Sequence, residues 1–173
     1  MENNYDKFIG SLFPTIFSPD YRLRNYIVYY MIHAISPSYS TAEMITVSNG
    51  VVELMIHLDQ SYMVICQNNR EFTVNNYIVG LNDAVNKIRA KVIIPEGKLH
   101  GIMIRFTFDR VYKLLKIKVA GLSDNIISLD DIFGYQGRQL FDRLKYAPDN
   151  AKRVAILNEF FLKLLEKDKI LYT

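Results

Sequence analysis

The sequence predicts a β-rich α+β fold, in which a β-barrel over about residues 14–106 precedes two or three α-helices over about residues 107–169. Short apolar segments separated by turn residues repeat along the first two-thirds of the chain, which is typical of an all-β barrel or sandwich. Near residue 107 the apolar period changes from two residues to three or four, which is typical of helices. Half of the 173 residues are apolar, so the chain can bury a substantial core.

Six segments before residue 107 have the composition of strands. They are rich in apolar and β-branched residues, and turn signals such as Asn49-Gly50 and Pro95-Glu96-Gly97 separate them. We expect strands at residues 51–58, 62–66, 71–74, 77–80, 88–94 and 100–106. Their spacing predicts the barrel or sandwich.

The tail is predicted to hold three helical segments. Thr107 is available as the N-cap of the first, which would carry four apolar residues on one face: Phe108, Val111, Tyr112 and Leu115. Ser128 and Asp131 then resemble a capping box that opens a short turn, and Gly134 ends it.

Two longer helices are expected after this turn. The first covers residues 136–147 and ends at Pro148, and the last runs from about residue 149 to 169. Five apolar residues form one stripe on the last helix: Val154, Leu157, Phe161, Leu164 and Leu165. Ile156 and Phe160 widen this stripe beyond a single band that faces the core, so they are the candidate dimer interface.

Composition narrows the class of protein. Cys66 is the only cysteine, which excludes an intramolecular disulfide and favours a reducing compartment. No apolar run approaches the roughly 18 residues that a membrane span needs. The start of the chain also lacks the charged and apolar regions of a secretory signal. We therefore expect a cytoplasmic protein with no membrane contact.

The net charge of +3 comes from the tail. Residues 136–173 carry eight Lys and Arg against five Asp and Glu, whereas residues 1–135 carry thirteen of each. A DNA-binding surface commonly makes about 6–10 phosphate contacts. Because acidic residues interrupt the basic ones, we interpret the tail as a solvated helical face and not as a nucleic-acid site.

Half of a metal-binding signature is present. Pro95-x-Gly97-x-x-His100 matches the second half of the motif by which cupin barrels hold a metal ion, but the His-x-His and Glu of the first half are missing. The other histidines are His33 and His57. Glu53 shares a strand face with His57, but four residues separate them by about 13 Å, too far to share one ion. The expectation is no metal and no cofactor, with a site of His100 plus one other histidine left open.

No motif predicts nucleophilic catalysis. The chain has no Gly-x-Ser-x-Gly elbow and no Gly-rich loop before a helix, and Cys66 lies in an apolar segment where a thiol is a packing residue. We therefore expect that the protein is not an enzyme.

Strand alternation selects three polar residues as candidate ligand-binding residues: Glu53, His57 and Arg105. Glu53 and His57 point to the same side of their strand, which is either the barrel interior or solvent. A guanidinium matches carboxylates in a two-pronged geometry, so Arg105 would face an anionic ligand, Glu53 or, on a half-exposed strand, solvent. A barrel of eight strands can enclose one small molecule.

A series of motifs runs in order through residues 14–167. They are Pro19-x-x-x-Leu23-x-x-Tyr26-Ile27-x-x-Tyr30, Asn49-Gly50-x-x-Glu53-Leu54, Val79-Gly80, His100-Gly-Ile-Met-Ile-Arg-Phe106, Tyr112-x-Leu114-Leu115-x-Ile117, Leu129-x-Asp131-x-Phe133-Gly134, Leu140-x-x-Arg143-Leu144 and Leu157-x-x-Phe160-x-x-x-Leu164. Together they resemble the sensor domains that open many AraC-type transcription regulators.

The resemblance implies a cupin-like jelly roll over residues 1–106 that senses a small molecule, and a helical dimerisation and linker region over residues 107–173. It also implies a homodimer and a C-terminal helix-turn-helix domain that binds DNA, which this chain does not contain. Two alternatives remain: a cupin-type metal-dependent isomerase or dioxygenase that uses His100, and a stand-alone small-molecule-binding module.

Overall fold

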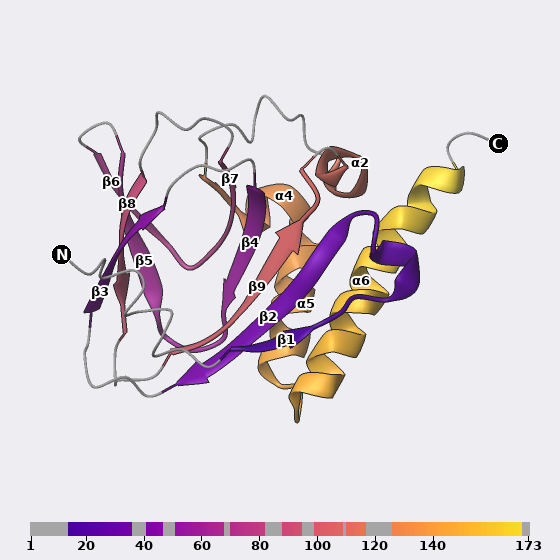
Figure 1. Ribbon diagram of the computed structural model, residues 1–173, viewed down its shortest axis with the longest axis horizontal. Helices are drawn as coiled ribbons and strands as arrows, with labels where there is room; N and C mark the ends of the chain where they lie inside the picture. The colour runs from indigo at the N-terminus through magenta and orange to yellow at the C-terminus, as the bar shows by residue number, and fades with distance from the viewer. Residues whose placement is uncertain are drawn as a thin grey trace.

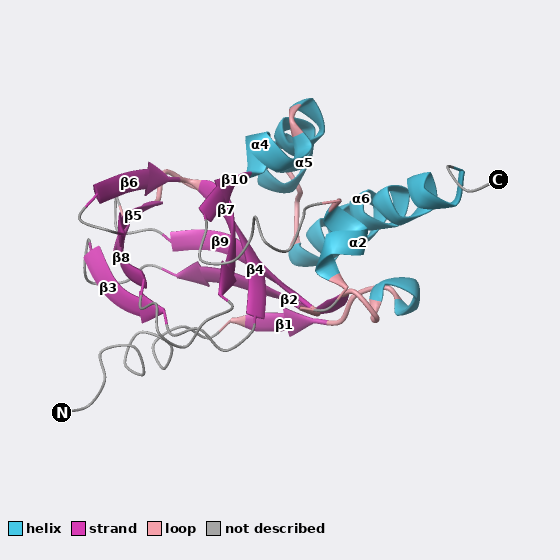
Figure 2. Ribbon diagram, turned by 90° about the horizontal axis from the view of Figure 1, so that it is seen from above, coloured by secondary structure: helices cyan, strands magenta, loops and turns pink. Residues whose placement is uncertain are grey.

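Two antiparallel β-sheets and a set of helices form the protein (Figures 1 and 2). The structure is a computed structural model, and it describes residues 14–35, 41–46, 51–67, 70–81, 88–94, 99–108, 110–116 and 126–170. Within these residues, no helix is long and apolar enough to cross a membrane.

The six-stranded sheet has the order β1-β2-β9-β4-β7-β10, and the four-stranded sheet has the order β3-β8-β5-β6. The strands are β1 Thr15–Phe17, β2 Ile27–Ile35, β3 Thr41–Thr46, β4 Val51–His57, β5 Tyr62–Gln67, β6 Arg70–Val74, β7 Asn76–Leu81, β8 Ile88–Ile93, β9 Leu99–Phe106 and β10 Ile126–Ser128.

The strand pairs are nested. β2 pairs with β9, β3 with β8, β4 with β7, and β5 with β6, all antiparallel. Successive pairs alternate between the two sheets, as when one long hairpin is rolled up, and this is the strand order of a double-sheet jelly roll. The strand pairings of the described residues lie within each sheet, so closure of the two sheets into one barrel stays a prediction.

The helical segments follow the nested strands, apart from one short turn near the start. They are the 3₁₀ turn η1 Tyr21–Leu23 and the α-helices α2 Val111–Leu115, α4 Leu129–Phe133, α5 Tyr135–Lys145 and α6 Asn150–Ile170. In both views the six-stranded sheet lies between the four-stranded sheet and the α-helices (Figures 1 and 2).

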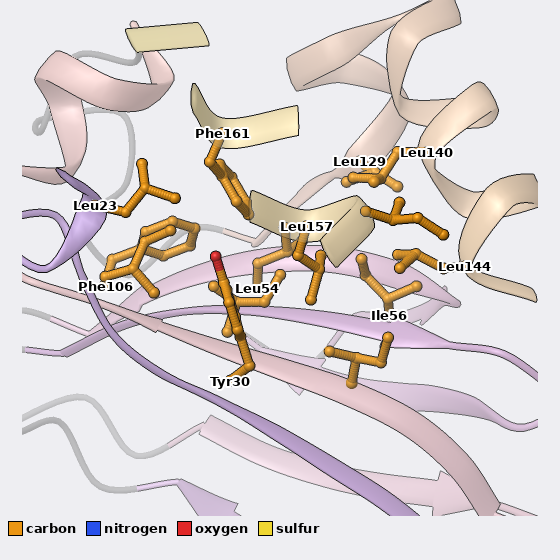
Figure 3. Packing of buried hydrophobic residues seen from close by; sticks show 14 of the residues in the cluster. Leu23, Tyr30, Leu54, Ile56, Phe106, Leu129, Leu140, Leu144, Leu157 and Phe161 are labelled. Carbon is orange, nitrogen blue, oxygen red and sulfur yellow. The ribbon is translucent and has the colours of Figure 1, made fainter. Parts of the chain in front are cut away.

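One face of the six-stranded sheet packs under the helices and forms the core. Strands β2, β9 and β4 supply three rows of paired residues that are at most 2% exposed: Ile27–Phe106–Val52, Tyr30–Ile104–Leu54 and Ile32–Ile102–Ile56. Figure 3 shows helical side chains above these strands, among them Leu157, Phe161 and Leu144. Phe161 meets Phe106 edge-to-face, with ring centroids 5.7 Å apart.

Helix α6 also contacts the helices beside it. Ile156 is only 3% exposed and belongs to the same core, and half-buried Phe160 meets Phe133 of α4 edge-to-face at 5.1 Å. The wide apolar surface of α6 therefore has partners within this chain: the sheet below it and helices α4 and α5 beside it.

A pair of hydrogen bonds joins α6 to the start of the six-stranded sheet. Asn158 Oδ1 accepts one bond from the buried Tyr30 hydroxyl and another from the Asp20 backbone N–H, both at 2.9 Å. Burial raises the pKa of the Tyr30 hydroxyl, so it stays protonated and donates to Asn158.

All six strands predicted before residue 107 are present, with ends displaced by at most one residue. The prediction that strands end at residue 106 is wrong, because β10 pairs with β7 at the edge of the six-stranded sheet. The N-cap half of the predicted capping box is confirmed: Ser128 is the N-cap of α4, and its Oγ accepts the Asp131 backbone N–H at 3.1 Å and donates to Asp131 Oδ2.

Two expectations for the first helix are wrong. The N-cap of α2 is Arg110 and not Thr107, whose carbonyl oxygen accepts the Arg110 and Val111 N–H groups in the turn before the helix. Helix α2 spans five residues: Val111, Leu114 and Leu115 are buried, whereas Tyr112, expected on the same apolar face, is 39% exposed. The described part of residues 107–170 holds four α-helices, α2, α4, α5 and α6, where two or three were expected.

Candidate functional site

The face of the six-stranded sheet that points away from the helices and toward the four-stranded sheet is the candidate site. We call it the inward face (Figure 2). Because side chains alternate along strands, the residues between the core rows form three further rows on β2, β9 and β4. These rows are Tyr29–Arg105–Glu53, Met31–Met103–Met55 and His33–Gly101–His57.

The first row holds an ion pair. Arg105 donates from Nε to Glu53 Oε1 at 2.8 Å, and its Nη2 donates to the same oxygen. The guanidinium also lies over the Tyr29 ring, 5.4 Å from its centroid. The side chains of Arg105 and Glu53 are 32% and 15% exposed, so the pair is only partly screened by solvent. Of the environments considered for Arg105, the structure shows the one in which it faces Glu53.

The last row brings two histidines together across a glycine. His33 and His57 each pair with Gly101, one from either side. A Cβ added at Gly101 would lie 2.9 Å from His33 Nε2 and 3.2 Å from the Ile56 carbonyl oxygen. The missing side chain therefore leaves the space that the His33 imidazole occupies.

Both histidines of this row are neutral at pH 7. Burial, together with the nearby His57 and His100, lowers the pKa of His33 to about 4, against the opposing effect of the Asp59 carboxylate. Burial also lowers the pKa of His57 to about 4, against the opposing effect of the Asp59 carboxylate. Each ring thus keeps one nitrogen lone pair near neutral pH.

Hydrogen bonds assign the tautomer of His57. Ser61 Oγ donates its proton to Asp59 Oδ1, and it lies 2.8 Å from His57 Nδ1. Because a hydroxyl has only one proton, Ser61 must accept from the Nδ1–H of His57. The lone pair of neutral His57 is then on Nε2. Asp59 Oδ2 also accepts the His100 backbone N–H at 2.6 Å, which ties the turn after β4 to the start of β9.

The middle row consists of methionines. Met31, Met103 and Met55 are side by side on adjacent strands, and all three are half-buried. Their thioethers separate the charged row from the histidine row. The inward face therefore offers three kinds of contact in succession: an ion pair, polarisable sulfur, and neutral imidazole.

The described residues do not fit the metal site that the half signature ending at His100 would imply. His100 lies on the opposite face of β9 from Gly101, and burial together with Arg153 of α6 lowers its pKa. Glu53 is two rows away from His57. Among the described residues, no group of three or more His, Cys, Asp or Glu side chains is placed to hold a metal ion. Of the half signature, which covers residues 95–100, residues 95–98 lie outside the described part of the chain, whereas His100 is described.

The structure thus brings the three candidate ligand-binding residues, Glu53, His57 and Arg105, onto one face. Glu53 and Arg105 are in contact, and His57 lies two rows along the sheet. The sequence did not single out Tyr29, the methionine row or His33 as partners. The strand over residues 27–35 was not delimited, and without its register nothing indicates which of its residues stand beside Met103 or Gly101.

The candidate dimer residues have different environments. Ile156 is buried in the chain's own core, so its side chain does not reach the surface. Phe160 lines an open groove of about 820 Å³ between α5 and α6, together with Tyr135 and Leu164. Tyr135 is 66% exposed at the start of α5. Polar and charged side chains such as Gln139 and Lys163 line this α5–α6 groove as well, so it offers a mixed apolar and polar surface beside Phe160.

Comparison with known proteins identifies similar structures but no sequence relative. No family model matches the chain, and no curated protein matches it. A cupin domain of an XRE-family transcriptional regulator from Enterobacter cloacae has 8% identity and a TM-score of 0.37, over 56% of this chain and 96% of that one. The plu4264 protein of Photorhabdus luminescens has 16% identity and a TM-score of 0.38, over 61% and 82%. A cupin domain from Bordetella pertussis Tohama I has 10% identity and a TM-score of 0.35, over 56% and 93%.

Proposed function

We propose that this chain is the ligand-sensing and dimerisation part of an AraC-type transcription regulator. A small-molecule effector binds at the inward face, and the helices transmit the change to a DNA-binding domain attached to them. The proposal assigns the chain a binding role and no catalytic one.

One observation carries the proposal: the same three strands serve both the inward face and the helical core. On β4, for example, Glu53 and His57 point inward, whereas Leu54 and Ile56 pack under the helices. A ligand that moves β4 relative to β9 therefore also moves the surface on which α6 rests. Such a ligand shifts the arrangement of the helices only by the difference in its affinity for the two arrangements.

The ion pair of the inward face supports an effector with polar or charged groups. Arg105 and Glu53 are partly buried, and both can exchange their mutual hydrogen bonds for bonds to a ligand that carries a donor and an acceptor. The series of motifs from residue 14 to 167 supports the regulatory role over that of a stand-alone binding module.

A thermal-shift screen against sugars, small acids and aromatic metabolites tests the proposal. We expect a hit to stabilise the folded chain by about 2.7 kcal/mol at one hundred times its dissociation constant. The double variant Glu53→Gln/Arg105→Met removes the inward ion pair and should abolish the shift.

The matched control is Asp130→Asn/Arg138→Met, which removes an exposed ion pair of α4 and α5 with a 3.3 Å separation. It should leave the ligand-induced shift intact. A screen without hits would contradict a sugar, small-acid or aromatic effector. A shift of equal size in both double variants would contradict binding of the hit at the inward face.

A further inference from the structure

The methionine row is the feature of the inward face that packing explains least. Met31, Met103 and Met55 come from strands that are distant in sequence, yet the register sets them directly side by side. They are three of the six methionines in the chain. A row that only filled the core would be buried like the rows on the opposite face, but these three side chains are half-buried.

The spacing allows the three sulfur atoms to converge. Neighbouring strands lie about 4.8 Å apart, so the outer two methionines flank Met103 at about that distance on either side. A methionine side chain has three rotatable bonds and adapts its shape. Met31 and Met55 can therefore lean toward Met103 with no change of the backbone.

The histidine row adds nitrogen donors next to the sulfurs. Residues two apart on a strand are separated by about 6.6 Å, which places His33 and His57 one row beyond the methionines. The His33 ring leans across Gly101, toward the centre of the three strands. His57 carries its lone pair on Nε2, as the hydrogen bond from its Nδ1 to Ser61 requires.

We propose that the inward face binds one soft monovalent metal ion, Cu(I) or its analogue Ag(I), through the thioethers of the methionine row and the imidazoles of His33 and His57.

The chemistry of the donors selects this class of ion. Thioether and imidazole are neutral, and thioether sulfur favours Cu(I) over the hard divalent cations, which require oxygen ligands. Glu53, the carboxylate on these rows, is already bonded to Arg105. A single positive charge is also easier to bury among neutral donors than a double one. The lowered pKa values of His33 and His57 mean that the ion does not compete with protons at neutral pH.

This site differs from the metal site of a cupin. It uses sulfur donors, it excludes His100, and it does not need the Glu of the missing half signature. It rests on the inward face being the ligand site of the proposed function, and it names a class of ligand for that face. It does not require the chain to regulate transcription.

The test uses the whole 173-residue chain with ¹³C-methyl methionine, titrated with Ag(I). We expect the methyl signals of Met31, Met55 and Met103 to shift together and to saturate at one equivalent. Single Met→Leu variants assign the signals, and these substitutions are close to volume-conserving. Competition with bicinchoninate under reducing conditions then measures the affinity for Cu(I).

Loss of one ligand should weaken Cu(I) binding by at least the 10–100-fold that loss of an outer-shell partner typically costs. Met103→Leu and His57→Gln should each show such a loss. His100→Gln changes the histidine on the opposite face of β9 and should leave the affinity unchanged. Circular dichroism confirms that each variant is folded, and the methyl shifts of the wild-type chain provide a readout that does not depend on the His variants.

Three outcomes would overturn the inference. In the first, Ag(I) leaves the three methyl signals unchanged. In the second, Cu(I) binding disappears in Cys66→Ser, which would assign the ion to the thiol. In the third, Met103→Leu binds as tightly as wild type. An organic hit in the thermal-shift screen together with any of these would leave the sensor proposal standing.

Discussion

At the residue scale, the histidine row couples stability to pH. His33 and His57 are 6% and 3% exposed. His57, His100 and Asp59 act on the pKa of His33, and Asp59 acts on the pKa of His57. Asp59 is held by three hydrogen bonds from Ser61 and from the His100 N–H. This carboxylate organises the turn but does not offset the burial of the imidazoles, so both rings titrate well below the usual pKa of histidine.

The folded chain should lose stability on mild acidification. Between the ordinary pKa of 6.5 and the folded value of about 4, the unfolded chain binds a proton on each ring and the folded chain does not. The free energy of unfolding should therefore fall with pH by about 1.4 kcal/mol per pH unit for each histidine. Urea titrations at intervals from pH 7 to pH 4.5 measure this slope.

His33→Asn removes one titrating ring. It should therefore remove about half of the pH slope that His33 and His57 together contribute to the free energy of unfolding. Lys152→Gln, at an exposed position of α6, is the control and should leave the slope unchanged. Equal slopes for His33→Asn and wild type would show that His33 is not the group responsible.

At the element scale, α6 is held on the six-stranded sheet by its apolar stripe and by a polar anchor at Asn158. Leu157 and Phe161 are fully buried against the sheet. Asn158, on the same helix, accepts hydrogen bonds from Tyr30 of β2 and from the backbone before η1. Apolar packing can tolerate small rotations of a helix, whereas a side-chain oxygen that accepts hydrogen bonds from two donors fixes the angle at which α6 lies on β2.

Asn158→Leu should destabilise the chain by about 1–3 kcal/mol, because it leaves the buried Tyr30 hydroxyl without its acceptor. In the background Tyr30→Phe the same substitution should cost less, since that donor is already gone. Asn158→Asp keeps the acceptor and should retain most of the stability. Urea unfolding of wild type, Asn158→Leu, Tyr30→Phe and the double variant gives the coupling energy. Strict additivity of the two substitutions would contradict the role of this bond.

At the scale of the whole molecule, the described residues form three layers: the four-stranded sheet, the six-stranded sheet and the α-helices (Figure 2). Strands β2, β9 and β4 belong to the middle layer. The inward face is turned toward the four-stranded sheet, the opposite face packs against the helices, and the α5–α6 groove faces solvent. The proposed sensor therefore has its ligand site on one side of the central sheet and its dimer surface on the other.

A second copy of the chain should associate through the α5–α6 groove. Tyr135 lines the groove and is 66% exposed, whereas Tyr146, at the other end of α5, is 78% exposed and lies outside it. Sedimentation at tens of micromolar should show a dimer that Tyr135→Asp weakens and Tyr146→Asp does not. A monomer at all concentrations, or equal effects of the two substitutions, would remove the groove as the interface.

The sequence by itself determined the local structure. Two-residue alternation located six of the strands, and the change of period located the long helices, because burial of one face imposes these periods on neighbouring residues. It also placed Glu53 and His57 on one side of a strand. The capping box at Ser128 and Asp131 was predictable for the same reason, since both partners are three residues apart.

Only the tertiary structure decided which strands stand side by side. The row of Met31, Met103 and Met55 and the gap at Gly101 depend on the register between paired residues 44 to 72 positions apart in the sequence. A shift of one residue would turn each of these side chains to the other face. Ile156 and Phe160 were likewise ambiguous, because an apolar helix surface is the same in sequence whether its own chain or a second one covers it.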